Sequence, residues 1–135
     1  MMSKLVSVIV PAYNEEASLL HLYEALKKLM ESLPDYDWEI LFINDGSKDK
    51  TLSIIESLYD TDKRIAYVDL SRNFGKEKAM LAGFDYCKGD CAVMIDADLQ
   101  DPPYLIKDML QYWEEGFEDV YAKRKDRGKE PWLRK

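Results

Sequence analysis

The sequence contains few of the residues that mark special classes of protein. Its 135 residues include two cysteines, one histidine, six glycines and five prolines. So little cysteine excludes a disulfide-stapled miniprotein, and so little glycine and proline excludes collagen and low-complexity disorder. The longest apolar stretch, Leu5–Val10, falls far short of the roughly 20 residues that cross a bilayer. The start of the chain lacks the pattern of a secretion signal. We therefore expect a soluble, cytoplasmic globular domain.

The charge is acidic overall but is unevenly spread. The formal net charge is −7, yet residues 123–135 carry seven basic and two acidic side chains. Residues 1–122 therefore hold 12 basic and 24 acidic side chains. Such an acidic body argues against nucleic-acid binding. The basic tail fits either an anionic surface, such as a layer of lipid headgroups, or a solvated chain end.

Apolar segments alternate between strand-like and helix-like spacing along the chain. Strands are expected at Leu5–Val10, Trp38–Ile43, Ile65–Leu70, Cys91–Ile95 and Asp119–Ala122. Helices are expected after the first four strands, beginning near Leu19, at Ser47 or Asp49, at Lys76 and at Pro102. This order predicts an α/β fold with a mostly parallel sheet and helices on both faces. We expect one domain over residues 1–122, followed by the basic tail 123–135.

Polar side chains follow each of the first four predicted strands. They occupy residues 11–16, 44–47, 71–76 and 96–103. In sheets of this kind, ligands bind beyond the carboxyl ends of the strands. The four segments therefore predict a binding site at one edge of the sheet.

The strongest local signal is Asp96-Ala97-Asp98, which follows an apolar strand. In a turn just past the strand, the two carboxylates can share one cation, and Gln100 adds a neutral oxygen. Oxygen ligands of this sort suit Mg²⁺ or Mn²⁺, which keep water ligands and bind substrate phosphates. An alternative of about equal weight is that Asp96 or Asp98 caps the following helix.

Four motifs together resemble a known family. They are Val8-Ile9-Val10-Pro11-Ala12-Tyr13-Asn14-Glu15, Asn44-Asp45-Gly46-Ser47, Ser71-Arg72-Asn73-Phe74-Gly75-Lys76 and Asp96-Ala97-Asp98-Leu99-Gln100-Asp101-Pro102-Pro103. In order and spacing they resemble family 2 glycosyltransferases, in particular the branch that transfers a sugar to a polyprenyl phosphate. The resemblance implies the Rossmann-like, nucleotide-binding half of the GT-A fold. One departure is Asn44, where the family usually has aspartate.

The resemblance also implies roles for individual residues. It assigns the nucleotide-sugar pocket to Pro11, Tyr13, Glu15, Ile43, Asp45, Lys76, Asp96 and Ala97. Within that pocket, Asp45 contacts the base with Ile43 beside it, and Asp96 and Ala97 contact the ribose and diphosphate. It assigns the metal to Asp96, Asp98 and Gln100, and catalysis to Asp98 and Arg124.

The function implied is a metal-dependent, inverting transfer from a UDP- or GDP-sugar to a polyprenyl phosphate. The ion would be Mg²⁺ or Mn²⁺, and the enzyme would work on the cytoplasmic side of the membrane, with the basic tail facing that surface. In this family, the acceptor region follows the segment seen here, so we expect a fragment of a longer enzyme. The sequence leaves the oligomeric state open, including a homo-oligomer. Two alternatives remain: a receiver-type phosphoryl-transfer domain, and a fragment that binds a nucleotide sugar without transferring it.

Overall fold

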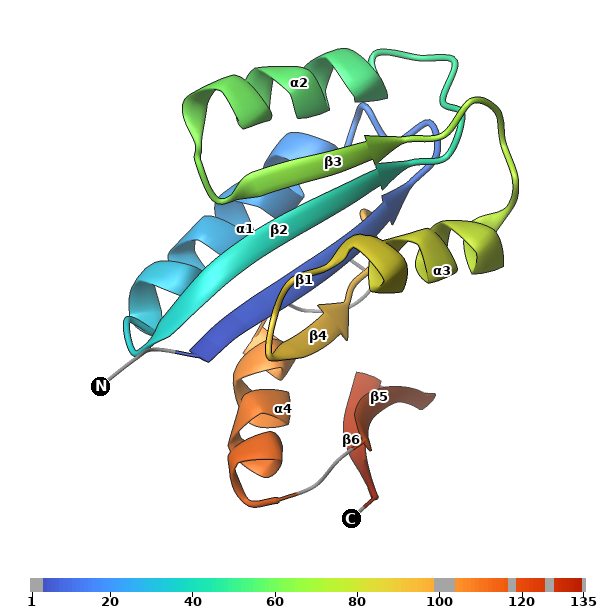
Figure 1. The fold of residues 1–135 in the computed structure, drawn as a ribbon. Coiled ribbons are helices and arrows are strands. Elements are labelled where there is room, and N and C mark those ends of the chain that lie inside the picture. The colour runs from blue at the N-terminus through green and yellow to red at the C-terminus, as the bar shows by residue number, and fades with distance from the viewer. Residues whose placement is uncertain (1–3, 99–103, 117–118, 126–127, 135) are drawn as a thin grey trace. The chain divides into compact units, whose positions relative to one another are not determined.

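A computed structural model describes residues 4–98, 104–116, 119–125 and 128–134 (Figure 1). The chain divides into two compact units, residues 1–100 and 101–135. The sequence predicted a functional boundary at residue 122, and that division stays a prediction. Among the helices that the structure describes, none combines the length and apolar character that crossing a bilayer requires.

The first unit contains one parallel four-stranded sheet and three helices. Its strands are β1 (Lys4–Ala12), β2 (Tyr36–Asn44), β3 (Ile65–Asp69) and β4 (Cys91–Met94). Its helices are α1 (Leu19–Ser32), α2 (Thr51–Thr61) and α3 (Lys76–Tyr86). The strand order is β3-β2-β1-β4, and every neighbouring pair is parallel. The predicted α/β class and parallel sheet are confirmed.

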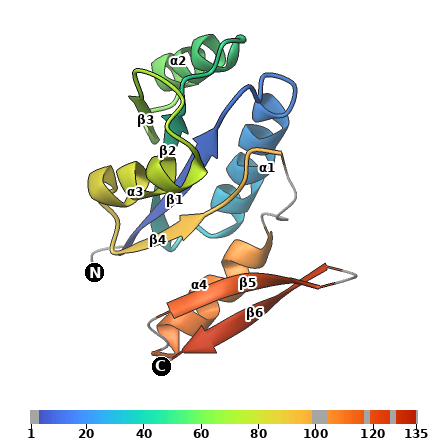
Figure 2. The ribbon, with the colours of Figure 1, turned by 90° about the vertical axis from the view of Figure 1, so that its right-hand side faces the viewer.

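The strand order fixes where the helices lie and where a ligand can bind. The chain builds outward from β1 to β3 and then returns to place β4 on the other side of β1. Because crossovers between parallel strands are right-handed, this reversal moves α3 to the opposite face from α1 and α2. Figure 2 shows α1 and α3 on opposite faces of the sheet. The point of reversal, between the carboxyl ends of β1 and β4, is where such folds bind ligands.

The central strands are buried on both faces. All five residues of the segment 6–10 in β1 are fully buried. One side of the sheet forms a core cluster in which Ile9, Leu41 and Ile43 pack with Ala79 of α3. A strand covered on both faces has apolar side chains at successive positions, which explains the continuous runs in the sequence. This rigid centre holds the strand ends that carry the polar segments.

The second unit differs from the sequence prediction. It contains α4 (Tyr104–Glu114) and two strands, β5 (Asp119–Lys125) and β6 (Gly128–Arg134), which pair antiparallel. The prediction of a strand at Asp119–Ala122 is confirmed, but its assignment to the parallel sheet is wrong, because it pairs with β6. Residues 128–134, expected as part of the tail, form that partner strand. A partner only a few residues away along the chain satisfies the backbone hydrogen bonds of β5 at little entropic cost.

An ion pair after α2 ties three elements of the first unit together. The carboxylate of Asp62 accepts hydrogen bonds from the Arg64 backbone N–H, Nε and Nη2 at 2.9, 3.0 and 2.8 Å. It also accepts one from the Tyr23 hydroxyl of α1 at 2.7 Å. These donors, Arg64 first among them, hold the pKa of Asp62 far below its usual value. The contact thereby links the end of α2 to α1 and to the start of β3.

Asp62→Asn is expected to lower the free energy of unfolding at pH 7 by about 1–2 kcal/mol, because it weakens charge-assisted hydrogen bonds at a partly exposed site. A carboxylate whose pKa is depressed by folding stabilises the protein above the unfolded pKa of about 3.9 and loses that effect as the pH falls below it. In urea unfolding between pH 7 and pH 2.5, the free energy of unfolding should therefore decrease less steeply with falling pH in the variant than in wild type. Asp60→Asn, at an exposed position of α2, is the control. If the free energy of unfolding of wild type and Asp62→Asn fell identically with pH, the stabilising role of the Asp62 carboxylate would be contradicted.

Candidate functional site

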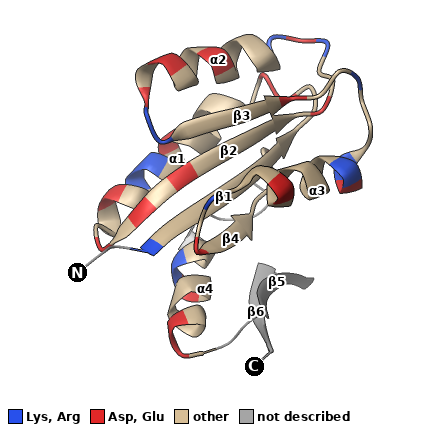
Figure 3. Cartoon of the chain, viewed as in Figure 1, with Lys and Arg blue, Asp and Glu red and all other residues tan. Residues whose placement is uncertain are grey.

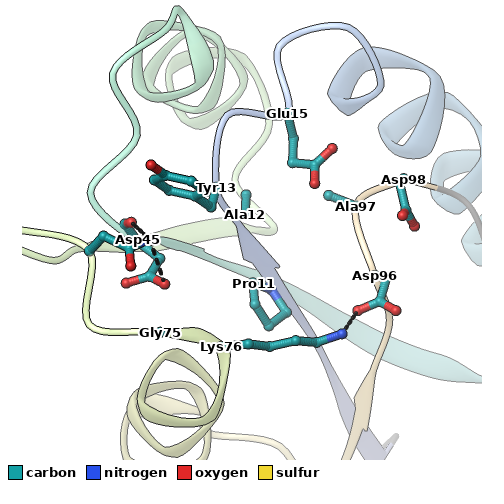
Figure 4. Close-up of a pocket in the computed structure, with 11 residues that line it drawn as sticks. Pro11, Ala12, Tyr13, Glu15, Asp45, Gly75, Lys76, Asp96, Ala97 and Asp98 are labelled. Atoms are coloured by element: carbon teal, nitrogen blue, oxygen red, sulfur yellow. Dashed lines mark hydrogen bonds and ion pairs between the residues drawn. The ribbon is translucent and has the colours of Figure 1, made fainter.

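A cleft of about 490 Å³ opens at the carboxyl ends of β1 and β4 (Figure 4). Its lining residues come from all four strand exits: Pro11, Ala12, Tyr13, Glu15, Asp45, Asn73, Gly75, Lys76, Asp96, Ala97 and Asp98. The volume is in the range of small-molecule sites, and the position is the switch point of the sheet. The structure thus brings together side chains that are up to 87 positions apart in the sequence.

One wall of the cleft is held by hydrogen bonds between two loops. The backbone N–H of Asn14 donates to Ser47 Oγ at 3.0 Å, and the N–H of Lys48 donates back to Asn14 Oδ1 at 2.8 Å. The N–H of Glu15 donates to Thr51 Oγ1 at 2.9 Å. Asn14 has a φ of 52°, a left-handed conformation that asparagine tolerates better than most residues. The loop after β1 therefore enters the cleft with a fixed backbone.

Asp45 connects this wall to the loop after β3. It is only 3% exposed, and its N–H donates to the Ala12 carbonyl at 2.9 Å. Its Oδ1 accepts a hydrogen bond from the Phe74 N–H at 2.8 Å. The Asn73 side-chain amide donates to the Asp45 carbonyl at 3.1 Å and to Oδ2 at 3.4 Å. Asp45 therefore positions the 71–76 loop in addition to lining the cleft.

The loop after β3 lies tightly against Gly46. Gly46 has a φ of +70°, and a Cβ at this position would overlap the backbone of Arg72 and Asn73. Only glycine combines this left-handed conformation with so close a backbone approach. The glycine of the Asn44-Asp45-Gly46-Ser47 motif thus lets two strand exits meet.

The opposite wall of the cleft is acidic, and one lysine side chain among the described lining residues lies against it. Figure 3 shows basic and acidic residues at the start of α3. Lys76, the first residue of this helix, places its Nζ 2.7 Å from Asp96 Oδ1. Asp98 lies two residues further along, and Glu15 points toward this wall from the other side (Figure 4). Burial, followed by repulsion from Asp98, Asp49 and Asp96, raises the pKa of Glu15. This part of the cleft therefore favours the arrival of positive charge.

The donor set fits a hard divalent cation such as Mg²⁺ or Mn²⁺. Asp96 and Asp98 offer carboxylate oxygens in the same cleft, and the Lys76 ammonium already occupies a cation position at Asp96. In the part of the chain that the structure describes, no three His, Cys, Asp or Glu side chains group as a metal cluster. Two carboxylates leave coordination positions for water and substrate phosphates, as these ions prefer. The third predicted ligand, Gln100, lies outside the described residues.

Most of the predicted site residues meet in this cleft. They are Pro11, Tyr13, Glu15, Asp45, Lys76, Asp96, Ala97 and Asp98. Their individual roles stay predictions. Three further lining residues, Ala12, Asn73 and Gly75, were not assigned from the sequence, although all three lie in or beside the quoted motifs.

One predicted residue, Ile43, does not line the cleft in the described structure. Ile43 is fully buried and packs with Ile9, Leu41 and Ala79, so its side chain does not reach the site. The alternation of side chains along β2 directs Ile43 into the core on the α3 side, while Asp45 lies just beyond the strand end. Arg124 belongs to β5 of the second unit, and its side chain is not among those described.

Comparison with known protein sequences identifies relatives over almost the whole chain. The model of glycosyl transferase family 2 matches residues 7–135. An uncharacterized glycosyltransferase of Synechocystis sp. is 47% identical over 128 residues, which are 95% of this chain and 40% of that protein. The bactoprenol glucosyl transferase of Shigella phage SfV is 42% identical over 130 residues, which are 96% of this chain and 42% of that protein. The chain thus spans about two fifths of the length of the curated relatives it matches.

Solved structures share the fold. S. aureus TarS 1–349 in complex with UDP aligns with a TM-score of 0.64 and 26% identity, over 84% of this chain and 32% of that chain. The mannosyltransferase PcManGT from Pyrobaculum calidifontis, in complex with GDP-Man and Mn²⁺, aligns with a TM-score of 0.63 over 72% of this chain and 28% of that chain. At 23% identity, this second match speaks for the fold alone. The shared architecture is the GT-A fold.

Proposed function

The chain belongs to glycosyl transferase family 2, and from this premise we propose that its cleft binds a nucleoside-diphosphate sugar with a divalent cation. The family assignment rules out the alternative of a receiver-type domain. The observation that carries the proposal is the meeting of Asp45, Lys76, Asp96 and Asp98 in one cleft at the switch point of the sheet. A nucleotide sugar needs such a set, because it has a base with donor groups, a diphosphate and an associated cation.

The nucleoside is proposed to bind on the side of Tyr13 and Asp45. Tyr13 is 43% exposed, so its ring is available to pack on a base. Asp45 Oδ2 accepts only a long hydrogen bond of 3.4 Å from Asn73 among the bonds described, which leaves acceptor capacity for a base N–H. Uracil and guanine both carry such a group, so this contact is compatible with the proposed UDP- or GDP-sugar donor. The complex of TarS with UDP supports the uridine form.

Asp98 and Asp96 are the proposed ligands of Mg²⁺ or Mn²⁺, with Gln100 as a further ligand. When bound, the ion would offset the negative charge that develops on the departing diphosphate. Lys76 and Arg124 are proposed to add positive charge near the same diphosphate. These residues stabilise charge that is larger in the transition state than in the bound donor, which is what accelerates the reaction.

The proposed acceptor is a polyprenyl phosphate, as the names of the bactoprenol glucosyl transferases suggest. A phosphate oxygen of the acceptor forms a bond to the anomeric carbon, and the bond from that carbon to the diphosphate breaks with inversion. The electron pair leaves with the nucleoside diphosphate. A phosphate monoester, with its second pKa near 6, is largely ionised at neutral pH and needs no strong general base. The seven basic residues within 123–135 are proposed to face the cytoplasmic surface of the membrane, where the lipid resides.

Unfolding of the 135-residue chain with UDP or GDP tests donor binding. At ten times its dissociation constant, the correct nucleotide with Mn²⁺ is expected to raise the free energy of unfolding by about 1.4 kcal/mol. A chelator should remove most of that gain. A chain that gains no stability from either nucleotide in the presence of Mn²⁺ would contradict the proposal. A second assay supplies polyprenyl phosphate in vesicles and measures the release of nucleoside diphosphate from the nucleotide sugar. Release indicates that the chain transfers the sugar, and its absence that the chain only binds the donor.

A further inference from the structure

We propose that Lys76 and the divalent cation replace one another at Asp96, so that the lysine holds the empty cleft in a charge-balanced state. When the donor binds with its cation, the Lys76 ammonium leaves Asp96 and pairs with the diphosphate. This inference deepens the proposed function and rests on it. Lys76 thereby couples cation binding to nucleotide binding.

The ion pair between Lys76 and Asp96 spans the cleft. Lys76 begins α3, whereas Asp96 follows β4, and their Nζ and Oδ1 atoms are 2.7 Å apart. Figure 4 shows the lysine side chain extended past Pro11 to reach Asp96. The side chain of Lys76 is 61% exposed and that of Asp96 is 27% exposed. A long, exposed side chain can move away without disturbing the core, so the pair is built to open.

Asp96 has acidic neighbours that make a cation necessary. Glu15 and Asp98 line the same cleft, and repulsion from Asp96 and Asp98 contributes to the raised pKa of Glu15. In the described structure, the Lys76 ammonium compensates part of this negative charge. An entering cation takes over that compensation with twice the charge.

The two cations do not share Asp96 favourably. An ammonium 2.7 Å from a carboxylate oxygen lies where a divalent ion bound to that carboxylate would repel it strongly. Without a nucleotide, the displaced Lys76 ammonium exchanges Asp96 for water only. Loss of the Lys76–Asp96 ion pair therefore lowers the affinity for the divalent ion. With a nucleoside diphosphate present, the ammonium gains phosphate oxygens, which are strong partners for lysine. The same lysine therefore weakens binding of the ion alone and strengthens binding of the nucleotide.

Isothermal titration calorimetry on wild type, Lys76→Met and Lys78→Met tests this exchange. Lys76→Met is expected to bind Mn²⁺ alone about three- to fivefold more tightly than wild type, because no ammonium competes for Asp96. In saturating Mn²⁺, the same variant should bind UDP about fivefold or more weakly. Lys78→Met removes the same charge from the same helix; its Nζ lies 5.9 Å from the centre of the Phe74 ring, and it does not line the cleft. It should match wild type in both titrations.

The opposite signs of the two changes distinguish the exchange from other roles. If Lys76→Met leaves either affinity unchanged, or shifts both in the same direction, the exchange is wrong while the proposed function stands. If wild type itself binds neither UDP nor GDP with Mn²⁺, the proposed function fails instead. Lys76→Gln repeats the test in a polar side chain should Lys76→Met fall below the wild-type free energy of unfolding.

Discussion

Asp98→Asn is expected to lower the affinity for UDP in the presence of Mn²⁺ by about 100-fold or more, to the value measured in a chelator. The substitution keeps the shape of the side chain and removes one negative charge from the acidic wall. Losing even an outer-shell partner of a metal ligand costs 10- to 100-fold, so losing a ligand costs at least as much. Because Asp98 is exposed on a turn, the free energy of unfolding without ligand should change far less than the affinity for UDP.

The effect of Asp98→Asn is measured by titrating UDP with Mn²⁺ and again with a chelator. Asp85→Asn, at another exposed aspartate near the carboxyl end of α3, controls for the change in net charge. A variant that keeps the wild-type dependence on Mn²⁺ would show that the ion does not bind at Asp98. Asp45→Ala should behave differently from Asp98→Asn, because it is expected to weaken UDP binding both with and without Mn²⁺.

Gly46→Ala is expected to lower the free energy of unfolding by about 3 kcal/mol or more. Two penalties combine: a φ of +70° strains any residue with a Cβ, and that Cβ would overlap the backbone of Arg72 and Asn73. Backbone atoms cannot turn aside as a flexible side chain does, so the loop after β3 must shift. The shift would move Asn73 and Phe74 away from the Asp45 carboxylate, and UDP affinity should fall together with stability.

Gly75→Ala separates the two penalties in a urea unfolding experiment. Gly75 also has a positive φ, of +97°, but a Cβ there would meet no atom within 4 Å. Its substitution should therefore cost about 1–3 kcal/mol from backbone strain alone, because a φ of 97° with a ψ of 157° is a conformation nearly confined to glycine. Equal losses for the two variants would show that the approach of the 71–76 loop to Gly46 is looser than described.

The parallel sheet could be predicted because its strands are short apolar runs separated by amphipathic helices. Trp38–Ile43 was expected and Tyr36–Asn44 is found, and such end shifts follow from backbone hydrogen bonds that side-chain patterns do not reveal. The fate of Asp119–Ala122 could not be predicted in the same way. A strand pattern specifies that a segment is extended, whereas its partner depends on which free strand edge lies nearest.

The site could be predicted as far as topology reaches. Parallel strands bring their carboxyl ends to one edge, so Asp45, Asp96 and Asp98 were expected to meet, and they line one cleft. The second role of Asp45, as acceptor for Phe74 and Asn73, could not be predicted, because it depends on loop backbone geometry. Ile43 was expected beside the base but is fully buried in the core, because a residue near a site in the sequence can still direct its side chain away from it.

The place of β4 in the sheet has a consequence for how the protein matures. Leu5 and Asp90 are 85 positions apart in the chain, yet their backbone and side chain are joined at 2.7 Å where β1 meets β4. Contacts between such distant residues form slowly and late. On the ribosome, the nascent chain must therefore expose one flank of β1 until β4 has emerged. The proposed nucleotide binding would then require that synthesis has passed Asp98, because Asp96 and Asp98 of the cleft follow β4. Shorter nascent chains would be the species most in need of chaperones.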